Sequence, residues 1–150
     1  MRIRRADLPF IVVLMGGGAV SMMVPAIHAA VGADYPTARA FLYSSLLFLV
    51  LFSFAAVATN QRRSKHPVRR YLIALVAFYA VLPLMLAVPL YESVGNTSFF
   101  NAYLEMVSSL TTTGASLFDV ERLAPSVHLW RAQVAWMGGF FVWVTAVAVL

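Results

Sequence analysis

Residues 108–118, SSLTTTGASLF, are the stretch of this 150-residue sequence whose residue types could do chemistry. They bring hydroxyl groups and a glycine together in a segment without formal charge. Oxygen atoms at matching distances can replace the water shell of a cation, and extended backbone supplies them as successive carbonyl groups. Gly114 allows backbone angles that a side chain would forbid, and the hydroxyl of Thr112 could add one more oxygen. The predicted chemistry is therefore cation coordination by a strand of backbone and hydroxyl oxygens.

The rest of the sequence offers little other chemistry. It has no cysteine, which excludes disulfides, thiolate metal sites and cysteine nucleophiles. No pattern pairs a nucleophile with a base, cradles a phosphate or clusters metal ligands, so we expect a protein that is not an enzyme and carries no cofactor. His28 and His128 leave one rival function open, because a four-helix haem-b electron carrier holds its haem between such histidines. A small membrane protein with a structural or assembly role is a second alternative.

Four long segments of the sequence contain no formally charged residue: 8–33, 40–61, 71–91 and 132–150. The whole chain is 61% hydrophobic and 11% charged, whereas soluble domains carry about 25% charged residues. Each segment reaches the roughly 20 residues that a helix needs to cross a bilayer at about 1.5 Å per residue. The sequence therefore predicts an all-α membrane protein surrounded by the lipid bilayer.

Most basic residues lie in two places, before the first predicted span and in the loop 61–70. By the positive-inside rule both places are cytoplasmic, so the N-terminus is expected inside and the protein is expected to be multi-pass. Because this basic loop is short and joins two membrane helices, we expect no nucleic-acid partner. Acidic residues on the opposite side would attract cations to that surface. They are Asp34, Glu92, Asp119 and Glu121.

Residues 92–131 form a connection far longer than the usual link of about 2–8 residues between helices. Within it, the apolar residues of SFFNAYLEMVSSL (98–110) recur with helical spacing, and Ser98 is placed to cap the helix. A helix of about 13 residues is about 20 Å long, too short to cross a bilayer. We interpret it as a half-helix that enters the membrane and returns as extended backbone lining a water-filled path. The alternative is an amphipathic helix on the outer surface.

Several single residues have predicted roles in packing. Glu105 lies in the middle of the half-helix, where an unpaired carboxylate is costly, so we expect it to order the loop by pairing or hydrogen bonding. Gly138 and Gly139 are interpreted as close-packing sites rather than a gating hinge. Trp130 and Trp136 are interpreted as anchors at the outer interface.

Two stretches of the sequence carry a family resemblance. FFNAYLEMVSSLTTTGASLFDVERL (99–123) and HLWRAQVAWMGG (128–139) resemble the first pore repeat of the Trk/Ktr/HKT superfamily of potassium transporters, in particular the bacterial Trk membrane subunit. The two preceding spans, with a bend expected at Pro25, also look like that subunit. The departures from the family pattern leave the filter intact and concern packing. They are Asn101, Ala135 and Phe141.

The resemblance implies a potassium uptake pore built from four helix–pore loop–helix repeats. In this chain it assigns residues 1–60 to two leading transmembrane helices, 61–70 to a cytoplasmic basic loop and 71–150 to the first repeat. One repeat cannot close a four-part pore, and the sequence stops inside an apolar segment. We therefore expect the chain to be the N-terminal portion of a longer protein, whose remaining repeats are its partners.

The resemblance also assigns the residues of the selectivity filter. The filter strand of this repeat would be Thr112, Thr113, Gly114, Ala115 and Ser116. The carbonyl oxygens of Thr112, Thr113 and Gly114 would bind the potassium ion, which is the substrate. Glu105 and Arg131 would support the pore loop. Three roles are open for Arg131: a pair with Glu105, bonds to loop carbonyls, or an interfacial position with the guanidinium in water.

Partners and location follow from the same resemblance. We expect a homodimer in the inner membrane of a bacterial cell, regulated by a cytoplasmic nucleotide-binding subunit. Passive conduction and symport driven by an ion gradient both stay open, as does the choice between potassium and sodium.

Overall fold

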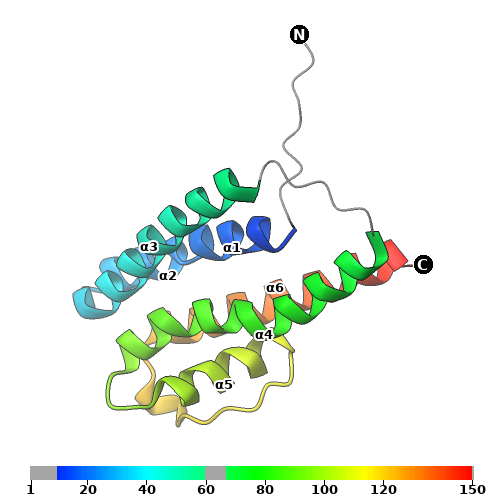
Figure 1. Ribbon diagram of the computed structural model, residues 1–150. Coiled ribbons are helices and arrows are strands. Elements are labelled where there is room, and N and C mark those ends of the chain that lie inside the picture. Colours follow the sequence, from blue (N-terminus) through cyan, green and yellow to red (C-terminus); the bar gives the residue numbers. More distant parts are fainter. Residues whose placement is uncertain (1–9, 60–66, 150) are drawn as a thin grey trace.

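The computed structural model describes residues 10–59 and 67–149 of the chain. In these residues every regular element is helical, which confirms the predicted all-α class. The elements are α1 (Phe10–Ser21), α2 (Met23–Val31), α3 (Tyr35–Thr59), α4 (Pro67–Val94), α5 (Phe99–Leu110), the 3-10 turn η1 (Val120–Arg122) and α6 (Pro125–Val149). Figure 1 shows α1 and α2 lying antiparallel to α3, beside a second group made of α4, α5 and α6.

The first predicted span is interrupted in its middle. α1 and α2 are separated at Met22. Pro25 explains the position of the break, because its ring has no N–H and crowds the carbonyl of Ser21, four residues earlier. The chain continues in a helical manner through the break, since the amide of Met22 donates to the carbonyl of Gly18 at 3.3 Å. The disturbance expected at Pro25 is therefore present, as a break just before the proline.

Two predicted helix boundaries are wrong by several residues. α4 begins at Pro67 and not at residue 71, so the end of the predicted loop 61–70 is helical; residues 60–66 lie outside the described residues. α6 begins at Pro125 and not at residue 132. Both helices start with proline, which is favoured at the first helical position because its missing N–H is not needed there.

The boundary of α6 was misplaced because the prediction began each span after its last charged residue. Arg131 lies inside α6, where its charge is paired with a carboxylate of α5. The carbonyl of Ala124 accepts hydrogen bonds from the amides of Val127 and His128, at 2.9 and 3.2 Å, and so opens the helix ahead of this arginine. The long connection predicted over 92–131 is correspondingly shorter.

Glycines of α1 allow two other helices to approach it closely. A Cβ added at Gly16 would lie 2.9 Å from the ring of Phe52 on α3, and one at Gly18 would lie 3.2 Å from the methyl group of Met85 on α4. Small residues at such contacts are typical of helix pairs in membranes. α1 therefore joins the α1–α3 group to the α4–α6 group.

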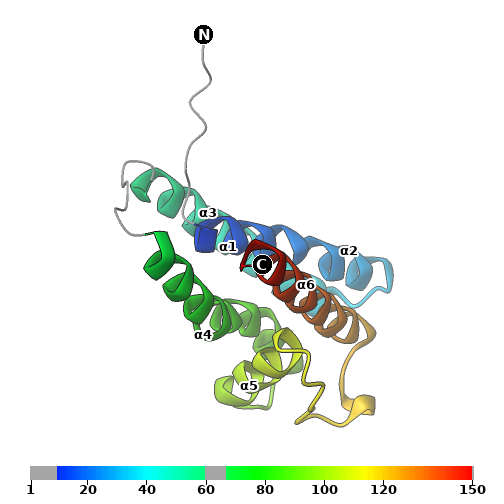
Figure 2. The same ribbon diagram turned by 90° about the vertical axis from the view of Figure 1, so that its right-hand side faces the viewer.

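Trp130 of α6 lies in the core and not at an interface. Its side chain is fully buried, its indole N–H donates to the carbonyl of Leu86 at 3.1 Å, and its ring meets Phe41 edge-to-face at 5.6 Å. The prediction that Trp130 is an interfacial anchor is wrong, because the protein itself supplies the partner that a buried indole N–H needs. Trp136 is 79% exposed, and its role as an anchor stays a prediction. Figure 2 shows α6 between α1 and α2 on one side and α4 and α5 on the other.

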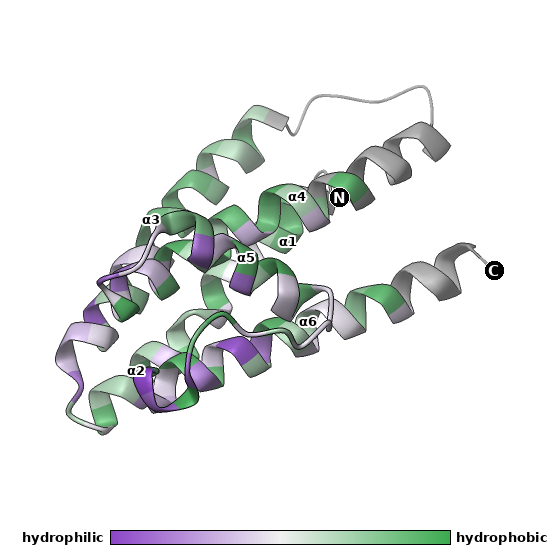
Figure 3. Cartoon of the chain, turned by 90° about the horizontal axis from the view of Figure 1, so that it is seen from below, coloured by the Kyte–Doolittle hydropathy of each residue, from purple (hydrophilic) through white to green (hydrophobic). Residues whose placement is uncertain are grey.

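Two helical stretches of the described residues are long and apolar enough to cross a membrane, Val12–Val31 and Tyr35–Ala58. They correspond to the first two predicted spans. A shorter apolar stretch, Phe78–Val94, lies in α4, and the third and fourth spans stay predictions. Figure 3 shows hydrophilic residues gathered where the α2–α3 turn, α5 and the beginning of α6 lie, so one end of the bundle is more polar than its middle.

Candidate functional site

α5 is the short helix expected ahead of TTTGAS. Ser98 caps its first turn as predicted, with Oγ accepting a hydrogen bond from the amide of Asn101 at 3.2 Å. The helix has 12 residues, hence a length of about 18 Å. It packs against α4 and α6 (Figure 1), and Met106 and Leu110 on its inner face are fully buried. α5 is therefore an integral part of the α4–α6 group.

The end of α5 places an unusual residue in a common motif. The amides of Thr112 and Thr113 donate back to the carbonyls of Ser109 and Ser108, both at 3.0 Å, which is the Schellman arrangement. The left-handed residue of this motif is usually glycine, and here it is Thr112, with φ +57°. A β-branched residue is strained at this angle. Because strain of this kind gathers at functional sites, Thr112 marks this turn as a candidate site.

Beyond Thr112 the chain runs without regular structure through Gly114, which has the positive φ that its position was predicted to need, +75°. Residues 111–117 are all exposed. Among the residues that the structure describes, none donates a hydrogen bond to the carbonyl of Thr112, Thr113 or Gly114. These three oxygens are therefore open to a ligand. They are the three for which ion binding is predicted.

The next residues of the loop are tied back to α5 by two of its side chains. Oγ of Ser108 donates to the carbonyl of Ala115 at 2.6 Å. The carboxylate of Glu105 accepts hydrogen bonds from the amide of Leu117 at 2.8 Å and from Oγ of Ser116 at 3.1 Å. The residues predicted to form one filter strand thus divide into three with unbonded carbonyls, followed by two that α5 holds.

Glu105 also forms an ion pair with Arg131 of α6, with 2.7 Å between Oε1 and Nη2. Glu105 is fully buried and the side chain of Arg131 is 19% exposed. Of the roles considered for Arg131, the structure shows the pair with Glu105. Breaking a buried ion pair from one side costs about 3–5 kcal/mol, because the other charge is left buried and unpaired. One carboxylate thereby connects α5, the loop and α6.

Gly138 brings α6 directly against the end of α5. A Cβ at this position would overlap the backbone carbonyl of Leu110. A Cβ at Gly139 would meet only the methyl group of Thr112, at the ordinary distance of 3.9 Å. The close-packing prediction is therefore confirmed for Gly138. Arg131 and Gly138 together seat the loop against α6 at two levels.

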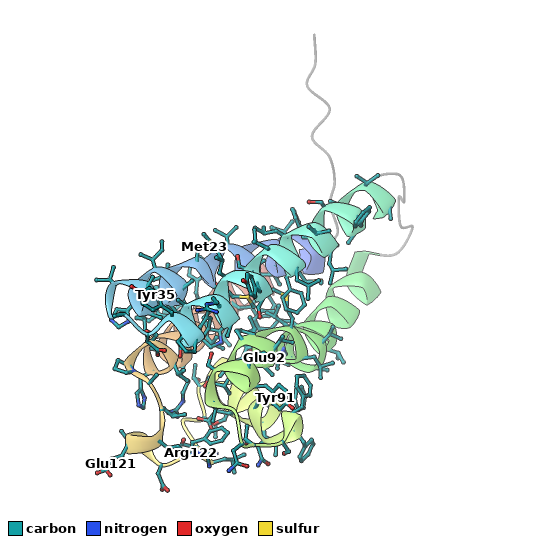
Figure 4. All side chains as sticks on the ribbon, turned by 90° about the vertical axis from the view of Figure 1, so that its left-hand side faces the viewer. Met23, Tyr35, Tyr91, Glu92, Glu121 and Arg122 are labelled. Atoms are coloured by element: carbon teal, nitrogen blue, oxygen red, sulfur yellow. The ribbon has the colours of Figure 1, made fainter. Side chains whose placement is uncertain are left out.

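The later part of the loop is fastened by Arg122, a residue that no sequence pattern singles out. Its Nη2 donates to the carbonyl of Asn96 in the α4–α5 turn at 2.5 Å, and its guanidinium lies 5.9 Å from the centre of the Phe118 ring. Figure 4 shows Glu121 and Arg122 at the end of the molecule opposite Met23. Neither this contact nor the one made by Ser108 is predictable from the sequence, because a periodic pattern marks the apolar face of a helix and not the reach of one polar side chain.

His28 and His128, on which the haem alternative rests, have separate protein partners. Nδ1 of His28 lies 2.8 Å from Oγ of Ser126, and Nε2 of His128 lies 3.0 Å from the carbonyl of Val120. In the part of the chain that the structure describes, no group of three or more histidine, cysteine or acidic side chains could hold a metal ion. The arrangement of the two histidines gives the haem alternative no support.

Comparison with known proteins places these features in a family. No family model matches the chain. The chain is 31% identical to the Trk system potassium uptake protein TrkH of Vibrio parahaemolyticus over 97% of its residues. It is 30% identical to TrkI of Halomonas elongata over 88% of its residues, and 33% identical to TrkG of Escherichia coli over 73%. The chain belongs to the Trk-type transporter family.

Membership of the Trk family confirms the resemblance carried by the two loop motifs, and it makes the chain part of a membrane protein. The named relatives are transporters, in agreement with the expectation that the chain is not an enzyme. The Trk-type chain covers 30%, 27% and 23% of the length of these three relatives. It therefore holds less than a third of each protein to which it is similar.

Proposed function

We propose that this Trk-type chain is the first pore repeat of a potassium uptake protein, and that four such repeats surround one selectivity filter. Three relatives that share most of its length are named as potassium uptake proteins. The order α4, α5, loop, α6 supplies a helix–pore loop–helix unit, and α1, α2 and α3 supply the two leading spans. The remaining repeats would come from further chain.

The observation that carries this proposal is the row of three unbonded carbonyls at Thr112, Thr113 and Gly114, directly after a half-length helix. Carbonyl oxygens replace the hydration shell of a monovalent cation. Residues 108–118 carry no charge, so the ion would be held by neutral oxygens only. Weak binding of this kind lets an ion leave as readily as it enters, which conduction requires. Since one strand offers oxygens from one side only, four strands are needed to surround the ion.

The direction of α5 supports the same reading. In the proposal α5 dips into the bilayer from the outer side and points its C-terminus at the middle of the membrane. The C-terminus is the negative end of the helix dipole, and it favours a cation where water is scarce. The loop after it would line a water-filled path, which is where non-helical backbone is tolerated at that depth.

The proposal extends to topology and assembly. The protein would be a multi-pass protein of the bacterial inner membrane, with the N-terminus and the basic loop 61–70 in the cytoplasm, as the distribution of arginine and lysine indicates. A homodimer and a cytoplasmic nucleotide-binding regulatory subunit are proposed on the resemblance alone. Passive conduction and gradient-driven symport are both compatible with a filter of this kind.

Replacement of Gly114 by alanine tests the filter, and Gly95 offers a matched control. Both glycines have positive φ, +75° and +63°, and a Cβ at either position meets nothing within 4 Å. The two substitutions therefore impose similar backbone strain inside and outside the loop. In the full-length protein, expressed in cells that lack other potassium uptake, we expect Gly114→Ala to lower the preference for potassium over sodium about tenfold, equivalent to about 1.4 kcal/mol. Gly95→Ala should leave this preference unchanged.

Rubidium uptake and competition by sodium measure the effect. If Gly114→Ala transports with the potassium preference of the parent protein, the filter assignment is wrong. The 150-residue chain reconstituted alone is expected not to conduct, since one repeat does not close a pore. Potassium flux through chains shown by cross-linking to be monomeric would contradict the four-repeat part of the proposal.

A further inference from the structure

We propose that Ser108 is a positioning residue that ends the ion-coordinating part of the filter strand at Gly114. It does so by holding the carbonyl of Ala115 against α5. This inference rests on the proposed function of the loop. It names a side chain that sets how many carbonyls the strand can present to an ion.

The geometry of the Ser108 hydroxyl takes one oxygen out of the row. Its Oγ lies 2.6 Å from the carbonyl oxygen of Ala115, at the short end of the range for O–H···O hydrogen bonds. A peptide carbonyl has a single direction, so a carbonyl that points at α5 does not also point at an ion path beside the loop. The hydroxyl proton further places positive charge next to this oxygen, which disfavours a cation there. The carbonyls before it, through Gly114, have no such partner in the described residues.

Ser108 also holds the strand from its other side. Its own carbonyl accepts a hydrogen bond from the amide of Thr113 at 3.0 Å, so one residue of α5 binds the backbone both before and after Gly114. Gly114 needs this restraint because it has the widest conformational freedom of any residue type, and no atom lies within 4 Å of where its Cβ would be. Packing therefore does not set the conformation of Gly114, and the hydrogen bonds on either side of it do.

Other side chains of the site act further along the loop. Glu105 bonds to Ser116 and Leu117, beyond the carbonyls in question. In the residues that the structure describes, Ser108 is the one side chain that bonds to the backbone between Thr112 and Ala115. The loss of its hydroxyl would free the Ala115 carbonyl to turn, and Gly114 would move with it.

Threonine and valine at position 108 separate the hydroxyl from the shape of the side chain, because the two are nearly identical in form and helix propensity. In the full-length protein, Ser108→Thr is expected to keep the potassium-over-sodium preference within about twofold. Ser108→Val is expected to lower it about fivefold, the effect of one lost hydrogen bond. Ser53→Val is a matched control, since Oγ of Ser53 donates to the carbonyl of Leu49 within α3, away from the loop.

The result for Gly114→Ala separates a failure of this inference from a failure of the proposed function. If Ser108→Val keeps the parent preference while Gly114→Ala loses it, Ser108 does not position the filter and the proposed function stands. If both keep it, the proposed function fails as well. A Ser108→Val protein with less total uptake but unchanged preference would assign the hydroxyl to stability and overturn the inference. Should that variant not fold, Ser108→Ala against Ser108→Thr makes the same comparison.

Discussion

Two helix ends in this molecule share one backbone motif and continue in different ways. At the end of α2, the amides of Ala33 and Asp34 donate back to the carbonyls of Ala30 and Ala29, at 3.2 and 2.9 Å, and Ala33 has φ +59°. At the end of α5, Thr112 takes the equivalent position. Both are Schellman ends in which a residue other than glycine adopts the left-handed conformation. Neither end was foreseen, because the sequence offers alanine and threonine where the motif usually has glycine.

The backbone after the motif separates a turn from a site. After α2, Asp34 opens α3 at once: its carboxylate accepts from the amide of Thr37 at 3.3 Å and its carbonyl from the amide of Ala38 at 3.0 Å. After α5 no helix begins, and the side chains of Glu105 and Ser108 hold the returning backbone instead. The side-chain supports, and not the helix end itself, therefore leave carbonyls open to a ligand.

Removing the carboxylate of Glu105 is expected to break this comparison with the largest effect. Glu105→Ala leaves Arg131 partly buried without its partner and removes the acceptor for the amide of Leu117. We expect the protein to lose about 3–5 kcal/mol of stability, as for other buried pairs broken from one side. The thermal stability of the detergent-solubilised full-length protein measures this loss. Glu121→Ala, which removes an exposed carboxylate of the same loop, is the control and should behave like the parent.

A second substitution separates the ion pair from the support of the loop. Glu105→Ala combined with Arg131→Met removes the orphaned charge, so part of the stability should return. The acceptor for the loop amide stays absent, so the potassium preference should stay low. If the double variant recovers both properties, the ion pair alone matters and the hydrogen bonds from Glu105 to the loop are dispensable.

Adjacent glycines of α6 provide the next largest effect. Gly138→Ala would place a methyl group in the carbonyl of Leu110 at the end of α5, and backbone cannot yield as a side chain does. We expect a loss of about 1–3 kcal/mol, typical of overpacking, together with a shift of the loop. Gly139→Ala meets only a methyl group at 3.9 Å and raises helix propensity, so it should be neutral or slightly stabilising. Equal stability of the two variants in a melting experiment would show that α6 does not press on α5.

The sequence predicted the parts of this site that depend on local pattern. Apolar spacing located α5, Ser98 was recognised as its cap, and TTTGAS identified the loop and its glycine. The pair of Arg131 with Glu105 was one of three roles considered, because a carboxylate in a short membrane-embedded helix needs a partner. Family resemblance joined these pieces, and relatives about 30% identical confirm the family itself.

Contacts that depend on three-dimensional placement could not be predicted in this way. Trp130 was assigned to an interface because tryptophan is common there, but its partner, the carbonyl of Leu86, lies 44 positions away in the sequence. The start of α6 was misplaced because a charge was taken as the end of a span, although that charge is neutralised by a helix distant in sequence. Ser108 looked like one more polar residue of the motif, since only the fold shows which carbonyl its hydroxyl reaches.

Replacing the two left-handed residues by glycine gives the smallest and sharpest comparison. Ala33→Gly and Thr112→Gly each relieve strain at a positive φ, so each should stabilise the folded protein by about 0.5–1 kcal/mol. In the α2–α3 turn nothing else changes, because Asp34 still begins the next helix. In the loop, glycine at 112 would adjoin a second flexible position at Gly114, with one residue between them. The strand would gain conformations, and its carbonyls would hold their row less firmly.

We therefore expect Ala33→Gly to raise the melting temperature of the full-length protein and leave potassium preference unchanged, whereas Thr112→Gly raises the melting temperature and lowers the preference about threefold. Competition between rubidium and sodium uptake gives the second quantity. If Thr112→Gly keeps the parent preference, the strain at Thr112 has no part in selectivity, and the two helix ends differ only in where they lie. If it loses preference while gaining stability, the strained threonine is retained at a cost in stability because it keeps the filter strand in a single conformation.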